Sequence, residues 1–139
     1  MRVLGIDLGR SRTGLALSDP LGLICSPLDT LVEKDEELLI QRITAVAEER
    51  EVTEVVLGLP RPLFGGTNEQ LESVLAFKSR LERALFVPVR TWDERFTSKL
   101  AQDNTVSRAG KDSIAASYML QNYLDSRMDV TGDEDTHEH

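Results

Sequence analysis

The chain of 139 residues is poor in cysteine, histidine and long apolar runs. Cys25 is the only cysteine, so neither an intrachain disulfide nor a cluster of thiolate metal ligands can form. The two histidines, His137 and His139, lie at the end of the chain, where we expect neither a metal ligand nor a base. No apolar stretch approaches the roughly 20 residues that span a bilayer, and no signal-peptide pattern opens the chain. We therefore expect a cytoplasmic protein without membrane partners.

The chain also lacks an excess of positive charge. It has 16 Lys and Arg against 24 Asp and Glu, a net charge of −8. Five of the acids lie in residues 129–139, which contain no Lys or Arg, so residues 1–128 carry 19 acids against 16 bases. Local placement of bases can still create a surface that binds phosphate. Seven bases lie in or beside the motifs described below: Arg10, Arg12, Arg61, Arg95, Lys99, Arg108 and Lys111.

The hydrophobic pattern predicts one α/β domain over residues 1–127. Short strand-like segments joined by turns come first, and segments of helical period then alternate with strands. The polar, acidic residues 128–139 are predicted to be a disordered tail. The resulting order βββαβαβα predicts a mixed five-stranded sheet flanked by helices. The predicted strands are 2–8, 12–18, 23–32, 54–59 and 86–92, and the predicted helices are 34–50, one opened by a capping box at 67–70, a short one after Thr97, and 112–124.

Asp7 is an acidic residue inside an otherwise aliphatic strand. An isolated buried carboxylate costs several kcal/mol, so the protein must compensate it. One interpretation places Asp7 at the end of the strand, accepting N–H groups of the turn at residues 9–11. The other makes it a metal ligand at the centre of the sheet.

Two further acidic positions lie at the ends of predicted elements. Asp93 and Glu94 follow the last strand, and because side chains alternate along a strand, only one of them can face the side of Asp7. The strand alone does not say which. Asp112 opens the last helix and shares the stripe of Ala115, Ala116 and Met119 that faces the sheet; it is either the helix N-cap or a ligand.

Carboxylates from the first strand, the last strand and the last helix can converge if the sheet brings the first and last strands close together. Carboxylate oxygens favour Mg²⁺ or Mn²⁺ over zinc. Two such ions can activate water and stabilise the leaving oxygen in phosphodiester cleavage, without a nucleophile from the protein. The aromatic side chains of Trp92, Tyr118 and Tyr123 are interpreted as core residues rather than as platforms for bases.

Four segments of the sequence, in order, resemble the motifs of a known family. They are Gly5–Gly9 with Arg12, Gly14, Ala16 and Ser18–Asp19; Val56–Pro60 followed by Gly65–Gly66; Asp93–Ser98 with Ala101; and Lys111–Ala116 with Leu120–Asp125. Over residues 1 to about 125 the chain resembles the YqgF/RuvX family of ribonuclease-H-like proteins, described as pre-16S rRNA nucleases and earlier as Holliday junction resolvases. The segment Arg61–Phe64 is less polar than the family usually shows there.

The resemblance implies a ribonuclease-H-like fold and a metal-dependent nuclease. It implies that the catalytic and metal-binding acids are Asp7, Glu94 and Asp112, which favours Glu94 over Asp93. It implies processing of the 5′ end of pre-16S rRNA, with resolution of branched DNA as the alternative. The expected partner is structured nucleic acid, and the expected state is a monomer or homodimer. The number of metal ions stays open, because typical resolvases have four acids.

Five bases are predicted to bind substrate: Arg10, Arg12, Arg61, Arg95 and Lys111. Arginine binds phosphate oxygens in bidentate fashion. Alternatively, Arg10, Arg12 and Arg95 neutralise the nearby acids when no metal is bound. A different class of function, nucleotide binding, is suggested by Asp7–Gly9 with Thr13–Gly14, which resembles the first phosphate loop of the actin and sugar-kinase group. A non-catalytic module is the third alternative.

Overall fold

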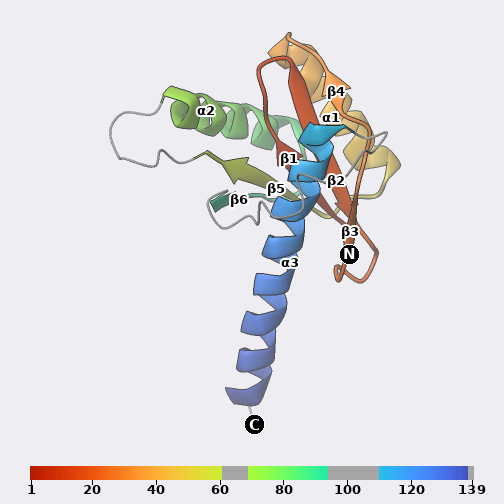
Figure 1. The fold of residues 1–139 in the computed structure, drawn as a ribbon, viewed down its shortest axis with the longest axis vertical. Coiled ribbons are helices and arrows are strands. Elements are labelled where there is room, and N and C mark those ends of the chain that lie inside the picture. The colour runs from red at the N-terminus through yellow and green to blue at the C-terminus, as the bar shows by residue number, and fades with distance from the viewer. Residues whose placement is uncertain (61–68, 94–109, 138–139) are drawn as a thin grey trace.

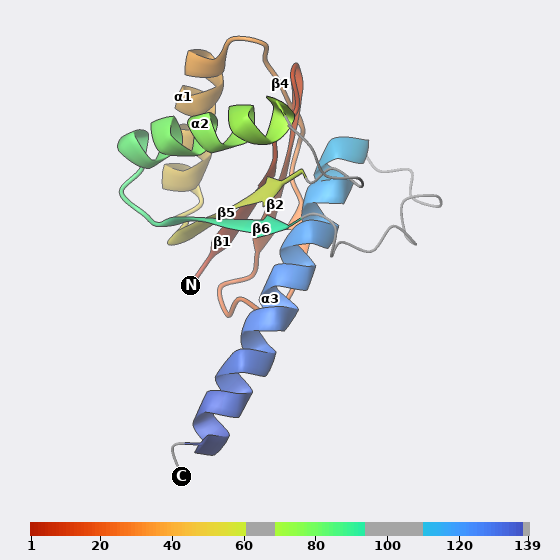
Figure 2. The same ribbon diagram turned by 90° about the vertical axis from the view of Figure 1, so that its left-hand side faces the viewer.

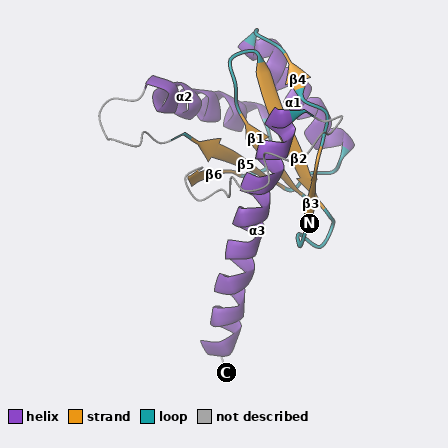
Figure 3. Cartoon of the chain, viewed as in Figure 1, coloured by secondary structure: helices purple, strands orange, loops and turns teal. Residues whose placement is uncertain are grey.

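The computed structural model describes residues 1–60, 69–93 and 110–137, with side chains as far as Arg127. Over these residues it shows a twisted mixed sheet with helices on both faces (Figures 1 and 3). The strands are β1 (Val3–Asp7), β2 (Arg12–Ser18), β3 (Cys25–Pro27), β4 (Leu31–Val32), β5 (Glu54–Leu59) and β6 (Val89–Asp93), and the helices are α1 (Glu36–Glu49), α2 (Glu69–Ala84) and α3 (Lys111–His137).

The strand order β3-β2-β1-β5-β6 places β1 in the middle of the sheet, with β4 beside the start of β2. The β1–β2 and β2–β3 pairs are antiparallel, whereas β1–β5 and β5–β6 are parallel. The carboxyl ends of β1, β5 and β6 therefore meet at one edge of the sheet. In open α/β sheets this edge is where ligands bind.

Each face of the sheet carries its own apolar core. Alternate residues of β1 enter different cores: Leu4 and Ile6 pack with α1 and α2, and Val3 packs with Ala116, Met119 and Leu120 of α3. Figure 2 shows α1 and α2 on one side of the sheet and α3 on the other. Residues of odd number in β1 therefore face α3.

The predicted α/β fold class is confirmed, and two strands differ from the prediction. The third predicted strand is present as β3 and β4, and the ladder is interrupted after Pro27, which has no N–H to donate, although Leu28 still donates to the Leu15 carbonyl at 2.8 Å. The last strand begins at Val89 rather than at residue 86, and Phe86 is fully exposed. The predicted turn at Gly65–Gly66, the cap residues Thr67 and Asn68 and the short helix after Thr97 lie outside the described residues.

The last helix is longer than the predicted helix 112–124. Helix α3 continues to His137 through most of the segment predicted to be disordered (Figure 1). Because α3 is already formed on the sheet, each further residue extends an existing helix and avoids the cost of nucleation. The domain boundary at residue 127 stays a prediction. In the described part of the chain, no helix is long and apolar enough to cross a membrane.

Candidate active site

Asp7 is the last residue of the central strand β1 and lies at the edge where the parallel strands end. By alternation it shares the α3 face with Val3 and Gly5. Its partner across the antiparallel pair is Gly14, and the pairing of Ile6 with Leu57 places Gly58 at its level on β5. Both neighbours lack a side chain, so no side chain of the adjoining strands crowds its half-buried carboxylate.

The start of α3 lies directly on Gly14. A Cβ atom added to Gly14 would lie 1.9 Å from the carbonyl oxygen of Asp112 and 2.6 Å from the nitrogen of Ser113. Only glycine allows the helix backbone to approach the strand so closely. Since Gly14 is also the cross-strand partner of Asp7, the same contact brings the backbone of Asp112 to the position next to Asp7.

Ser113 anchors this helix start to the sheet. Its side chain is fully buried, and its Oγ accepts a hydrogen bond from the backbone N–H of Leu15 at 3.1 Å. The Oγ1 of Thr30 lies 2.9 Å from the same oxygen. Residues 14 and 15 of β2 lie between the segments that pair with β3 and with β4, so the helix supplies a partner where the strand ladder is interrupted. Asp112 is therefore held by its neighbour in sequence.

Asp112 is paired with Arg12 of β2. The Nε of Arg12 lies 3.0 Å from Oδ2 of Asp112, and the two side chains are 56% and 35% exposed. An ion pair this exposed contributes little to stability and exchanges readily with solvent or ligands. The carboxylate is therefore accessible for other partners. The arrangement agrees with the expectation that Arg12 neutralises a nearby acid, and it leaves a role in phosphate binding open.

The residues after β6 are only partly described. In β6, Arg90 and Trp92 face α3, whereas Asp93 pairs with Leu59 and shares the opposite face with Val89. Glu94 lies outside the described residues, as do Arg61 and Arg95. Asp7 and Asp112 are thus the two predicted acids that the described structure brings together.

Of the remaining predicted bases, Arg10 and Lys111 are both exposed. Arg10 belongs to the turn after β1, and Lys111 is the first residue of α3, so each lies next to one of the two acids in sequence. Within the ranges that the structure describes, no three His, Cys, Asp or Glu side chains are grouped tightly enough to hold a metal ion. A third acidic ligand would have to come from elsewhere in the chain.

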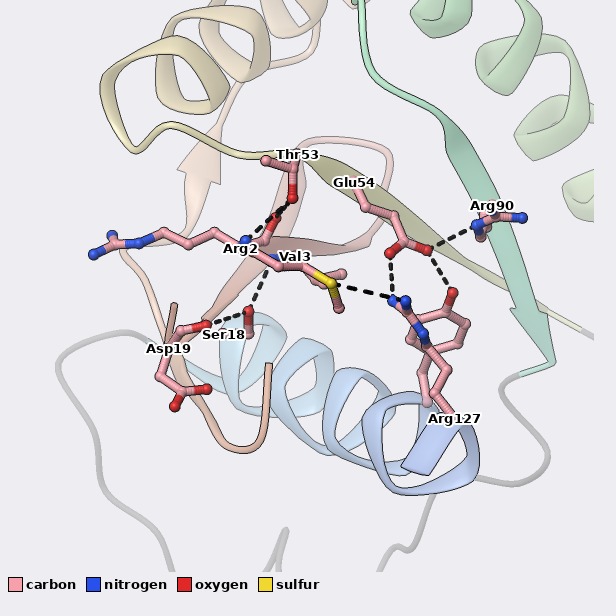
Figure 4. A network of polar contacts seen from close by, with 10 residues as sticks. Arg2, Val3, Ser18, Asp19, Thr53, Glu54, Arg90 and Arg127 are labelled. Carbon is pink, nitrogen blue, oxygen red and sulfur yellow. Dashed lines mark hydrogen bonds and ion pairs between the residues drawn. The ribbon is translucent and has the colours of Figure 1, made fainter. Parts of the chain in front are cut away.

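A second charged cluster occupies the same face at the other end of the sheet. The carboxylate of Glu54, only 7% exposed, accepts a hydrogen bond from the Tyr123 hydroxyl at 2.5 Å and pairs with Arg127 and, at 2.8 Å, with Arg90 (Figure 4). Burial and the Glu54 carboxylate raise the pKa of Tyr123 to about 12. Glu54 begins β5, four residues before Gly58, so this cluster is about 13 Å along the strand from the level of Asp7, at roughly 3.3 Å per residue.

Of the three aromatic residues predicted to lie in the core, Tyr123 belongs to it and Trp92 packs against it. Trp92 and Tyr123 pack edge to face, with ring centres 5.7 Å apart, between β6 and α3. Tyr123 is buried, and Trp92 and Tyr118 are half-buried.

Sequence reasoning missed the residues that position Asp112. Ser113 and Thr30 carry no pattern that singles them out, because their contact joins positions 83 residues apart. Gly14 gave a signal only as part of a family motif. Its role follows from the close contact between Gly14 and the backbone at the start of α3.

Sequence similarity to other proteins identifies the family of this chain. The sequence model of the RuvX family, described as "Holliday junction resolvase", matches residues 1–126. A protein of Clostridium kluyveri named "Putative pre-16S rRNA nuclease" is 38% identical over 133 residues, which cover 90% of this chain and 97% of that protein. One of the same name from Clostridium acetobutylicum is 39% identical over 134 residues, covering 91% of this chain and 99% of that protein.

Solved structures with a similar fold include two resolvases. Thermus thermophilus RuvC in complex with a Holliday junction superposes with a TM-score of 0.62 at 18% identity, over 92% of this chain and 96% of that chain. The fowlpox virus Holliday junction resolvase superposes with a TM-score of 0.53 at 12% identity, over 91% of this chain and 99% of that chain. At these identities the likeness is one of fold, and it confirms the ribonuclease-H-like class. By its sequence the chain belongs to the RuvX family of nucleases, hydrolases of phosphodiester bonds in nucleic acid.

Proposed function

We propose that the chain is a divalent-metal-dependent nuclease whose catalytic acids are Asp7, Glu94 and Asp112 and whose substrate is the 5′ end of precursor 16S rRNA. One observation carries the proposal: the backbone of Asp112 lies on Gly14, the cross-strand partner of Asp7. The backbones of two acidic residues that are 105 positions apart in sequence thereby meet at one corner of the sheet.

The donor set suits Mg²⁺ or Mn²⁺. Carboxylate oxygens are the ligands these ions prefer, and the Asp7 side chain is only half-buried. When bound there, such an ion would act as a Lewis acid on the phosphate and lower the pKa of bound water. The proposal does not fix the number of ions.

Support for Glu94 as the third acid comes from the alternation of β6. Arg90 and Trp92 face α3, the side on which Asp7 lies, whereas Asp93, the last residue of β6, does not. The resemblance of residues 93–98 to the family motif supports the same choice.

The chain's own bases would prepare the site for a polyanion. Arg12 compensates the charge of Asp112, and its guanidinium can exchange this partner for a phosphate oxygen of similar geometry. Arg10 and Lys111 are exposed beside the two acids and can bind neighbouring phosphates of the strand. Arg61 and Arg95 complete the proposed set of substrate-binding residues.

The choice of RNA follows the names of the relatives, which cover nearly the whole chain. The proposed partner is structured precursor rRNA, and the proposed working unit is a monomer or homodimer in the cytoplasm. The direct test incubates purified protein and its Asp7→Asn variant with precursor 16S rRNA in the presence of Mg²⁺, Mn²⁺ or EDTA. We expect a new 5′ end only in the reactions that contain the wild-type protein together with Mg²⁺ or Mn²⁺. Intact RNA in all reactions would contradict the proposal.

Resolution of branched DNA is the second candidate, because the family model itself carries that description. The same protein is therefore given a four-way DNA junction under identical conditions. Symmetrical cuts in the junction, with precursor RNA left intact, would replace the first proposal by the second. Tight binding of ATP without cleavage of either substrate would favour a nucleotide-binding module.

A further inference from the structure

A pocket of about 450 Å³ opens at the same sheet edge as Asp7, on the face covered by α1 and α2. It is enclosed by three segments: the turn that follows β1, the entry into α1, and the first two turns of α2. Residues of that turn and of the start of α2 both line it. The volume lies within the range of roughly 300–1,000 Å³ that is usual for ligand pockets. The structure brings these segments together from positions 8–10, 33–39 and 69–77.

The lining combines an apolar floor with a polar rim. Leu8, Leu39, Val74 and Phe77 form the floor and are continuous with the core between the sheet and the two helices. The rim has three carboxylates (Glu33, Glu36, Glu69), an amide (Gln70), a hydroxyl (Ser73) and two cations (Arg10, Lys34). A flat, partly apolar molecule with hydrogen-bond donors at its edge fits such a lining.

The rim favours a nucleobase over a phosphate group. The apolar floor suits a flat ring and offers no donor to a phosphate oxygen. Two of the carboxylates have partners, since Glu36 pairs with Arg80 and Glu33 lies 3.9 Å from Arg42. Each carboxylate has acceptor sites for more than one donor, and the exocyclic amino groups of bases are donors that Glu accepts from.

The position of the pocket links it to the substrate. Its lining begins at Leu8, the residue after Asp7, and Arg10 belongs both to this lining and to the proposed phosphate-binding set. Asp7 faces α3 and the pocket lies on the opposite face, so a strand whose phosphate is held near Asp7 would have to pass over this edge of the sheet to reach it. A base on a neighbouring nucleotide can then turn into the pocket while the phosphates stay beside Arg10.

We infer that the pocket binds an unpaired nucleobase of the nucleic-acid substrate, close to the phosphate that is cleaved. This inference rests on the proposed nuclease function and narrows the substrate to strands with an unpaired nucleotide near the cut. Extruding a base from a continuous duplex costs unpairing energy, whereas an unpaired base is delivered without that cost. Continuous duplex is therefore a poor substrate.

The test uses a short RNA duplex with one bulged 2-aminopurine, whose fluorescence reports its environment, bound in EDTA so that no cleavage occurs. Ser73→Trp fills the pocket from an exposed position of α2, and Gln70→Trp fills it from the first turn of the same helix. Ser79→Trp is the matched control, because Ser79 is exposed on the same helix and is not part of the lining. Circular dichroism first selects the variants that fold.

We expect wild type and Ser79→Trp to change the fluorescence and to bind the bulged duplex about tenfold more tightly than an unbulged one, a typical effect of one bound base. The pocket-filling variants should lose both effects. Equal binding of the two duplexes by wild type, or an undiminished preference in folded pocket-filling variants, would overturn the inference. Because these are binding measurements, their outcome is separate from whether wild type cleaves precursor rRNA.

Discussion

The two ends of the α3 face of the sheet each hold a carboxylate paired with arginine, and the surroundings of these carboxylates differ. Glu54 is 7% exposed and is held from three directions by Tyr123, Arg90 and Arg127. Asp112 is 35% exposed and is paired with Arg12, itself 56% exposed. Glu54 is a structural clamp between β5, β6 and α3, and Asp112 is presented to solvent beside Asp7.

The difference separates stabilising charge from functional charge. A buried carboxylate with several donors cannot bind a metal ion or substrate without first losing those donors. A carboxylate at a sheet edge, beside glycines and next to a second acid, has space for a ligand and gives up little to bind it. We therefore expect substitutions at the Glu54 end to change stability and substitutions at the Asp7 end to change activity.

The largest expected effect is that of Asp7→Asn compared with Glu54→Gln. Asp7→Asn should lower the cleavage rate by about a thousandfold or more, with an unchanged or raised Tm, because active-site charges are often held at the expense of stability. Glu54→Gln should leave the rate within about twofold and lower the free energy of unfolding by about 1–3 kcal/mol. Cleavage assays and urea unfolding of both variants measure this contrast. Equal losses of rate would remove the distinction between the two ends.

A second comparison uses two glycines beneath α3. Gly14→Ala places a methyl group on the Asp112 backbone, so the helix start must move, and we expect the rate to fall about a hundredfold, as a displacement of about 1 Å can cause. Gly5→Ala is the matched control, because its methyl group would meet the Leu120 side chain, at 2.9 Å, farther along α3. The control should lose stability and keep most of its activity. A Gly14→Ala variant with full activity would show that the contact does not position Asp112.

Ser113→Ala tests the anchor with a smaller expected effect. Loss of the hydroxyl leaves the buried N–H of Leu15 without its acceptor, which costs about 1–3 kcal/mol of stability. The rate should fall about tenfold, with a weaker apparent affinity for Mn²⁺. Ser117→Ala is the control on the same helix, since that hydroxyl donates to the Ile114 carbonyl within α3. Equal effects of the two substitutions on Mn²⁺ affinity would assign Ser113 a purely structural role.

The smallest effect on activity is expected for Tyr123→Phe. The pKa of Tyr123 is raised in the folded protein, so the folded state holds the phenolic proton more tightly than the unfolded chain, whose tyrosine pKa is about 10. Wild-type stability should therefore fall as the pH rises from about 10 through about 12, and this part of the loss should be absent in Tyr123→Phe. Urea unfolding at a series of alkaline pH values measures it. Identical pH profiles for both proteins would contradict the pairing with Glu54.

Much of this arrangement could be predicted from local patterns in the sequence. The strand Arg12–Ser18 and the strand Glu54–Leu59 have the predicted bounds, because runs of apolar residues ended by turn residues define them. Asp7 stood out because an acid within an aliphatic strand needs an explanation. The length of the last helix could not be predicted from periodicity, because periodicity does not include the effect of a helix already formed before a polar segment.

The candidate site depends more on contacts that no local pattern records. The approach of Asp112 to Gly14 and the bond between Ser113 and Thr30 join distant parts of the chain, so spacing alone could not predict them. The pocket beside Asp7 was missed for the same reason, since its lining comes from three separate segments. Local patterns in the sequence single out the candidate acids and do not reveal the residues that hold Asp112 in place.

The most direct test of the account is a crystal of the protein soaked in Mn²⁺, with the ion located by its anomalous scattering. The account predicts an ion bonded to carboxylate oxygens of both Asp7 and Asp112, and its absence from crystals of Asp7→Asn. Carboxylates of Asp7 and Asp112 that point into separate surroundings, with no shared ion in a protein that still cleaves its substrate, would contradict it.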